Sequence, residues 1–197
     1  AEVPLASARQ AGTPPAPASA PHALSFKQIE DMADKLAQRL KADPKDPQGW
    51  AMLARSYTML GRRAEAVTAY ERAVALQGQD ASLLADYADA LAVTRESRLA
   101  GEPAALVERA LKLDPDHAKA LSLAGTAAVE RKDYAGAVAR WEHLLEVAPP
   151  DSPFVGPMRA NIAQARELGG LAGTAAAASS AGSGRGPRIG ITQPAGQ

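Results

Sequence analysis

The chain has 197 residues, in which 22 lysines and arginines balance 22 aspartates and glutamates, and it contains no cysteine. A neutral balance gives no support for binding to nucleic acid or to an anionic membrane surface. The lack of cysteine excludes thiol catalysis, cysteine-ligated zinc and disulfide bonds. Charges interrupt the apolar stretches, so we expect no direct membrane insertion by this chain. Because it does not begin with Met, we expect a processed or truncated piece of a longer protein.

Composition divides the chain into three regions. Residues 1–24 are rich in alanine and proline and are expected to form a disordered linker. Residues 170–197 are rich in alanine, glycine and serine and are expected to form a disordered tail. Between them, residues 25–169 are long enough to bury a continuous core as one domain.

The domain is expected to begin and end with single helices. The first covers about 25–41, with Ser25 as N-cap and Gln28 as its capping-box partner. The last covers about 154–168 and stops at Gly169-Gly170. The end units of a helical repeat stack have no neighbour to cover them, so these helices are predicted to act as caps.

Between the caps, a pattern of large and small residues returns about every 34 residues. Trp50, Leu53 and Tyr57 on one helix, then Ala66 and Tyr70 on the next, follow the tetratricopeptide pattern. Altered copies follow, so repeats are predicted at about 47–80, 81–117 and 118–151. The sequence therefore predicts an all-α tetratricopeptide-repeat solenoid of three helix pairs with capping helices at both ends. The helix pairs are expected at 47–60 with 63–77, 81–94 with 103–113, and 118–131 with 134–147.

The middle unit and the aromatic residues allow two finer expectations. Equivalent repeat positions on the two helices lie 19 residues apart in the middle unit and 16 residues apart in the other two units. This difference predicts an enlarged turn at 95–103. Trp50, Tyr57 and Trp141 are expected to pack in the core, while alanines and Gly125 allow close helix approach.

The first helix of each tetratricopeptide unit lines the concave face, which predicts a binding groove of mixed character. The candidate groove residues are Met52, Arg55, Met59, Asp86, Asp89, Leu123 and Thr126. Methionine adapts to varied partners, so the mixture suits an amphipathic helix whose basic residue meets Asp86 or Asp89. Only Arg55 and Lys119 are basic at the groove positions, which argues against a clamp for a C-terminal carboxylate. An alternative site is the enlarged turn around Arg95 and Arg98.

No pattern predicts catalysis, a cofactor or a metal. His143 and Glu146 share a helix face at a spacing that metal ligands use, but two ligands do not make a site. Asp86 and Asp89 have the spacing of paired carboxylates, yet they are more simply polar groups of a groove. Phosphate-binding and dinucleotide-binding motifs are absent from the sequence. We therefore expect a protein that is not an enzyme.

Three segments carry a resemblance to a known family: residues 46–57, 101–115 and 137–151. They resemble the periplasmic domain of the cytochrome c biogenesis factor CcmI, also called CycH, and the similar NrfG subunit of a haem lyase. The most distinctive parts are the Gly101-Glu-Pro103 end of the enlarged turn and the helix containing Trp141 before Pro149-Pro-Asp151.

The resemblance implies a periplasmic chaperone, tethered to the inner membrane in the full-length protein. Such a protein would hold apocytochrome c by its C-terminal helix and deliver it to the haem ligation complex, with subunits such as CcmF and CcmH as partners. The alternative is a structural tetratricopeptide scaffold that joins subunits of an envelope assembly and holds no client.

Overall fold

The computed structural model describes residues 25–152 and 155–171. These residues form eight α-helices and no strand. The expected linker 1–24 and most of the expected tail, 172–197, lie outside the described residues. The helices are α1 (Phe26–Ala42), α2 (Pro47–Met59), α3 (Arg63–Leu76), α4 (Ala81–Thr94), α5 (Glu102–Leu113), α6 (Ala118–Glu130), α7 (Tyr134–Val147) and α8 (Val155–Leu168).

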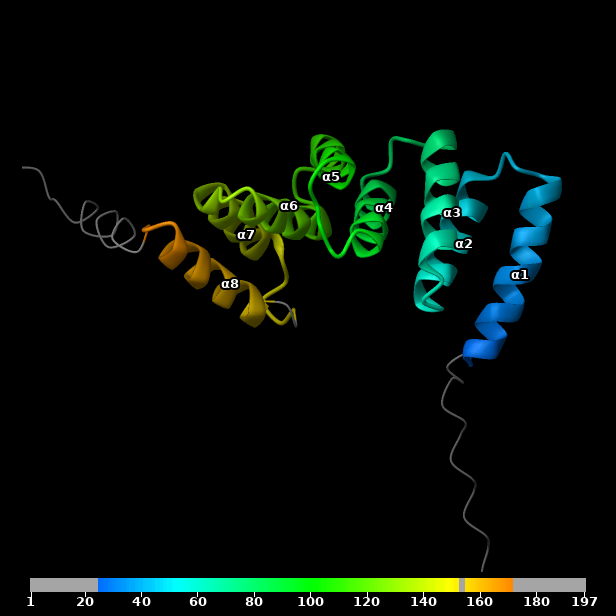
Figure 1. The fold of residues 1–197 in the computed structure, drawn as a ribbon, viewed down its shortest axis with the longest axis horizontal. Helices are drawn as coiled ribbons and strands as arrows, with labels where there is room; N and C mark the ends of the chain where they lie inside the picture. The colour runs from blue at the N-terminus through cyan, green and yellow to red at the C-terminus, as the bar shows by residue number, and fades with distance from the viewer. Residues whose placement is uncertain (1–24, 153–154, 172–197) are drawn as a thin grey trace, which may run out of the picture.

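The helices form an elongated stack in which α1 and α8 lie at opposite ends (Figure 1). Each helix packs against its neighbours in sequence, and the pairs α2–α3, α4–α5 and α6–α7 make the most extensive contacts. In addition, α4 contacts α6 directly, which places first helices of successive units side by side. The predicted fold class, a tetratricopeptide solenoid of three helix pairs with a capping helix at each end, is confirmed.

Polar side chains determine where most helices begin. The predicted capping box at α1 is present, because Ser25 and Gln28 each accept a hydrogen bond from the other's backbone N–H. Side-chain oxygens accept the N–H three residues later at three further N-caps, which are Asp46, Asp80 and Asp133. At α6 the cap is His117, whose Nδ1 accepts from the amide nitrogen of Ala120 at 3.2 Å. The sequence pattern did not anticipate a histidine in this role.

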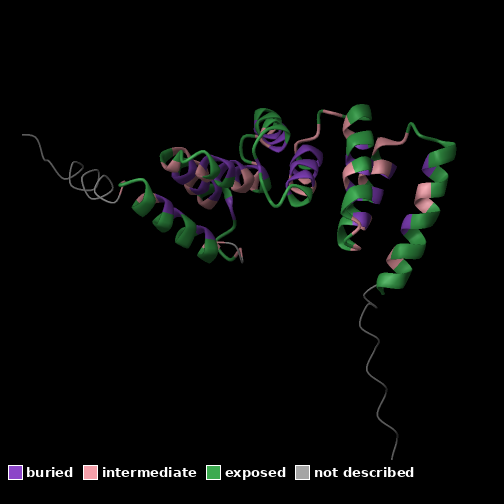
Figure 2. Cartoon of the chain, in the orientation of Figure 1, coloured by how far each residue is buried: buried purple, intermediate pink, exposed green. Residues whose placement is uncertain are grey.

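The core is a layer of alanine, leucine and aromatic side chains along the facing sides of the helices (Figure 2). Alanines at the helix crossings are almost completely buried, and they include Ala66, Ala73, Ala110 and Ala137. Gly125 on α6 lies directly against the indole ring of Trp141 on α7. Trp141 is 5% exposed, and its Nε1 donates to the carbonyl oxygen of Ser122 at 3.2 Å. The predicted small-against-large packing is therefore present.

Trp50 enters the core less deeply than expected. It is only partly buried, and its Nε1 donates to the carbonyl oxygen of Pro44 at 2.9 Å. Trp50 borders two hollows together with Lys41 of α1, so this end helix covers the residue incompletely. Tyr57, which lies later on the same helix, is 8% exposed and belongs to the core as predicted.

The enlarged turn between α4 and α5 is an ordered part of the structure. Leu99 is 2% exposed and packs with Ala92 and Ala127, away from the main core. Both carboxylate oxygens of Glu130, at the end of α6, accept the Leu99 N–H at 3.0 Å. Thus a residue of the next unit holds the insertion in place.

Glycines end α8, as the sequence predicted. Gly170 has a φ of 65°, and the N–H of Leu171 reaches back to the carbonyl oxygen of Arg166 at 2.7 Å. Leu171, which was assigned to the tail, is partly buried against the core. Leu171 therefore extends the packed part of the chain beyond the glycines that end α8.

Candidate functional site

The inner face of the solenoid, formed by α2, α4 and α6, carries all the groove residues proposed from the sequence. Met52, Arg55 and Met59 lie on α2, Asp86 and Asp89 on α4, and Leu123 and Thr126 on α6. In the structure the charged residues among them lie at the centre of this face, and the uncharged residues lie on either side.

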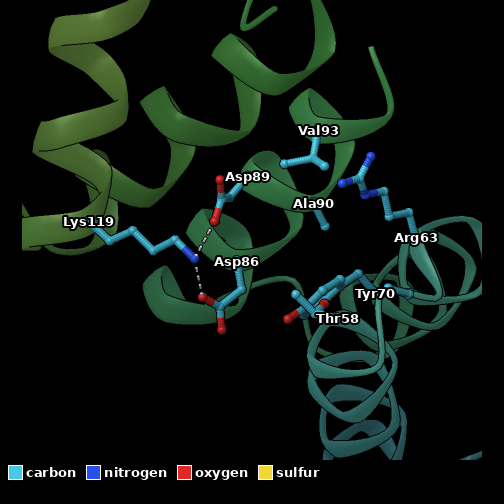
Figure 3. Close-up of a pocket in the computed structure, with 10 residues that line it drawn as sticks. Thr58, Arg63, Tyr70, Asp86, Asp89, Ala90, Val93 and Lys119 are labelled. Atoms are coloured by element: carbon cyan, nitrogen blue, oxygen red, sulfur yellow. Dashed lines mark hydrogen bonds and ion pairs between the residues drawn. The ribbon is translucent and has the colours of Figure 1, made fainter. Parts of the chain in front are cut away.

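Four charged side chains from three inner helices meet in one charge network: Arg55, Asp86, Asp89 and Lys119. Arg55 Nε lies 3.0 Å from Asp86 Oδ2. Lys119 Nζ reaches across from α6 and lies 2.9 Å from Asp86 Oδ1 and 2.9 Å from Asp89 Oδ2 (Figure 3). The network therefore ties α2, α4 and α6 together on the inner face.

Both carboxylates of the charge network are already neutralised by internal partners. Burial of the Lys119 ammonium lowers its pKa, but the bonds to Asp89 and Asp86 outweigh this effect, and the pKa is raised overall. Lys119 is consequently charged at neutral pH. A basic residue of a ligand would have to compete with Lys119 and Arg55 for Asp86 or Asp89, a condition that the sequence did not reveal.

Beside the charge network lies a hollow of about 240 Å³. Its base includes the buried ring of Tyr70, and Thr58 lies next to this ring in Figure 3. Burial raises the pKa of Tyr70, and the charge of Asp86 raises it further. The hollow is lined by Thr58, Gly61, Arg63, Ala66, Tyr70, Asp86, Asp89, Ala90, Val93 and Lys119.

Exposed apolar side chains accompany these charges. Met52 and Met59 are 62% and 63% exposed on α2, and Val93 at the end of α4 is 38% exposed. Leu123, by contrast, is half-buried and packs against Leu99 and its neighbours. It therefore offers less surface to a ligand than either methionine.

Thr126 lies apart from the central hollow. Its hydroxyl donates to the carbonyl oxygen of Ser122 at 3.1 Å. It lines a separate hollow formed with α7 and α8, together with Trp141 and Asn161. The candidate residues are thus spread over two places on the inner face, and α8 extends this face beyond α6.

Of the two residues considered for metal binding, His143 and Glu146, the histidine contacts a carboxylate of another turn. His143 Nε2 lies 2.7 Å from Asp116 Oδ1. Across residues 25–152 and 155–171 there is no group of three or more side chains of the types that hold metal ions. Nor does any helix in this part of the chain have both the length and the apolar character needed to cross a membrane.

A stack of helix pairs with a mixed apolar and charged inner face defines a tetratricopeptide-repeat domain. The sequence profile of the family described as "Cytochrome c-type biogenesis protein H TPR domain" matches residues 17–155, well over half of the chain. The chain therefore belongs to this family, as its resemblance to CcmI/CycH predicted.

Curated relatives agree with the family. Cytochrome c-type biogenesis protein CycH of Pseudomonas aeruginosa is 36% identical over 150 residues, which cover 76% of this chain and 36% of the relative. CycH of Rhizobium meliloti is 29% identical over 153 residues, which cover 78% of this chain and 40% of the relative. The chain thus spans less than half the length of these relatives.

Solved structures share the fold at low sequence identity. MamA superposes with a TM-score of 0.64 at 19% identity, over 74% of this chain and 81% of that one. PilW, a type IV pilus biogenesis factor, gives 0.57 at 20% identity, over 73% of this chain and 64% of that one. At this level of identity the similarity concerns the fold alone.

Proposed function

We propose that this domain takes part in c-type cytochrome biogenesis as a protein-binding module. Its client is apocytochrome c, which it holds before haem is attached and delivers to the haem ligation complex. Membership of the cytochrome c-type biogenesis family supports this assignment. The structural observation that carries it is the inner face, where exposed methionines flank a charge network.

The ligand is an amphipathic helix, the C-terminal helix of the client. Its apolar stripe covers Met52 and Met59, which present flexible thioether side chains to solvent on one face of α2. The groove residues proposed from the sequence, Arg55 and Asp86 among them, lie alongside. Charged groups at such a face contribute more to register and specificity than to affinity.

The proposal also includes the place where the domain works and its partners there. The domain works in the periplasm, tethered to the inner membrane as part of a longer protein, and its partners include haem ligation subunits such as CcmF and CcmH. The absence of cysteine from the chain prevents mixed disulfides with the thiols of the unfolded client. The domain itself performs no chemical step.

The proposal is tested by titrating a peptide that copies the C-terminal helix of an apocytochrome c into the protein. Met52→Glu and Met59→Glu place charge beneath the apolar stripe and should weaken binding tenfold or more, about 1.4 kcal/mol each. Leu113→Glu is the matched control, because Leu113 is also exposed, at 46%, but lies on the second helix of its unit.

Apocytochrome c and holocytochrome c are then compared as whole proteins. A holding function requires preference for the apo form. If neither the peptide nor apocytochrome c binds, the domain is instead a structural scaffold for envelope subunits. If binding survives both methionine variants, the site lies elsewhere, with the turn around Arg95 and Arg98 as the first place to examine.

A further inference from the structure

Arg63 differs from the other basic residues around the central hollow. It is the first residue of α3, and its side chain extends into the hollow, opposite Ala90 and Val93 (Figure 3). Arg55 and Lys119 both bind carboxylates. Within residues 25–152 and 155–171, the guanidinium of Arg63 has neither a hydrogen bond nor an ion pair.

The balance of charge at the hollow follows from this difference. The charged residues that line it are Arg63, Lys119, Asp86 and Asp89, and Arg55 binds Asp86 from outside the lining. The charge network is neutral by itself, and Arg63 adds one positive charge in excess. The hollow is therefore complementary to a negative group, although its most evident charged residues in the sequence are two aspartates.

We propose that the hollow receives an acidic side chain of the bound helix, whose carboxylate pairs with Arg63. The inference rests on the proposed function and names the chemistry of the ligand at one place in the groove. It reverses the sequence-based expectation that a basic ligand residue would meet Asp86 or Asp89, because those carboxylates already have partners and Arg63 would repel a second cation nearby.

The hollow has room for a side chain. Its volume is about 240 Å³. Gly61, in the turn before α3, leaves its surroundings open, with no atom within 4 Å of the position of a Cβ. A side chain thus has room to approach past the turn towards Arg63.

The walls of the hollow strengthen the proposed pair. Tyr70 is 3% exposed and Ala66 is 1% exposed, so one side of the pair faces buried groups of low polarity. Low polarity strengthens the pair on that side, while water screens the outer side of Arg63, which is exposed. The guanidinium can bind both oxygens of a carboxylate. Met59 and Val93 lie exposed near the ends of α2 and α4, where the apolar stripe of the bound helix would pass.

The test uses two designed helical peptides that share one leucine stripe and differ in a single flanking residue, Glu or Lys. The wild-type protein should bind the Glu peptide at least tenfold more tightly. In Arg63→Gln this preference should vanish, whereas in Arg72→Gln it should remain. Arg72 is a suitable control because it is exposed on the same helix and does not line this hollow. Circular dichroism and the urea midpoint establish that both variants are folded.

The apocytochrome peptide provides the second readout. Each of its carboxyl groups is replaced in turn by the amide, with the C-terminal carboxyl as a separate arm, and binding is measured with wild type and Arg63→Gln. Replacement of the carboxyl group that pairs with Arg63 should weaken binding to the wild type and leave binding to Arg63→Gln unchanged. A double-mutant cycle requires this result for a direct pair.

The outcomes separate the two proposals. If the designed peptides show the Glu preference but apocytochrome c does not bind, the proposed function is wrong and the carboxylate site stands. Equal binding of the two designed peptides, a preference for Lys, failure of both to bind, or a Glu preference that survives Arg63→Gln overturns the inference.

Discussion

At the scale of single residues, the contact between α6 and α7 depends on the absence of a side chain at Gly125. A Cβ at this position would overlap the indole ring of Trp141. The ring is held by burial and by the hydrogen bond from Nε1, its atom nearest to that Cβ position, to the carbonyl oxygen of Ser122, so it has little freedom to move. Small residues at helix crossings are thus a requirement of the packing here.

Gly125→Ala is therefore expected to destabilise the domain by about 1–3 kcal/mol, the usual effect of overpacking. Elsewhere in a helix the same replacement stabilises by roughly 0.5–1 kcal/mol, so the sign is diagnostic. Urea unfolding measures the difference. A stabilising effect of Gly125→Ala, as expected at an open helix position, would contradict the close contact.

Two units end their first helix with a residue in the left-handed conformation, but with different residues. Gly61 after α2 has a φ of 72°, and Lys132 after α6 has a φ of 60°. In both turns the next residue donates its N–H to a carbonyl five residues back, at 2.8 Å for Arg62 and 2.9 Å for Asp133. The geometry is shared, and only glycine adopts it without steric cost.

Lys132→Gly should accordingly stabilise the domain by about 1 kcal/mol, since it removes the cost of a left-handed side-chain-bearing residue. Gly61→Ala should destabilise by a similar amount at the matching place. Both positions are exposed, so packing changes do not complicate the comparison. Thermal and urea unfolding of the two variants would contradict the explanation if both effects had the same sign.

At the scale of elements, the insertion between α4 and α5 is held by α6. The carboxylate of Glu130, at the end of α6, accepts the backbone N–H of Leu99. This bond and the burial of Leu99 fix the turn that contains the left-handed residues Glu96 and Ser97. A long turn therefore remains ordered because the next unit supplies both an acceptor and an apolar contact.

Glu130→Ala should cost about 1–3 kcal/mol, because it leaves a partly buried backbone N–H without its acceptor. Glu130→Gln retains one acceptor oxygen and should lose less. Hydrogen exchange at Leu99 provides a local measurement, since its N–H should exchange faster in the alanine variant. Unchanged exchange would show that the turn is held by Leu99 packing alone.

At the scale of the whole molecule, each helix pair is covered only by its neighbours, so the ends need caps. Buried side chains of α8 cover α7, namely Met158, Ile162 and Ala165. An ion pair between Arg166 and Glu142 joins the same two helices. Stability in such a stack is nearly a sum of neighbour contacts, so the loss of a cap exposes one complete interface.

Two truncations test this dependence. A chain that stops after Leu171 should keep its thermal midpoint within a few degrees, the equivalent of about 1 kcal/mol or less. A chain that stops after Asp151 loses α8 and should lose about 3–6 kcal/mol, from about 1.5–3 kcal/mol for each of two large buried side chains. A similar midpoint for both chains would show that α8 does not act as a cap.

The sequence by itself determined the repeat architecture, because helix periodicity, small residues at crossings and turn glycines are local properties that recur about every 34 residues. It also identified Arg55, Asp86 and Asp89 as residues of one face, since repeat positions map directly onto faces of the stack.

Tertiary structure alone decided how these groups are used. Arg55 and Lys119 together neutralise Asp86 and Asp89, and Glu130 binds the backbone N–H of Leu99. Arg63 is left as the positive group of the hollow. Pairing between charges on different helices depends on the tilt and spacing of those helices, which a linear pattern does not contain. The residue types of the inner face could therefore be read from the sequence, but the net charge that it presents to a ligand could not.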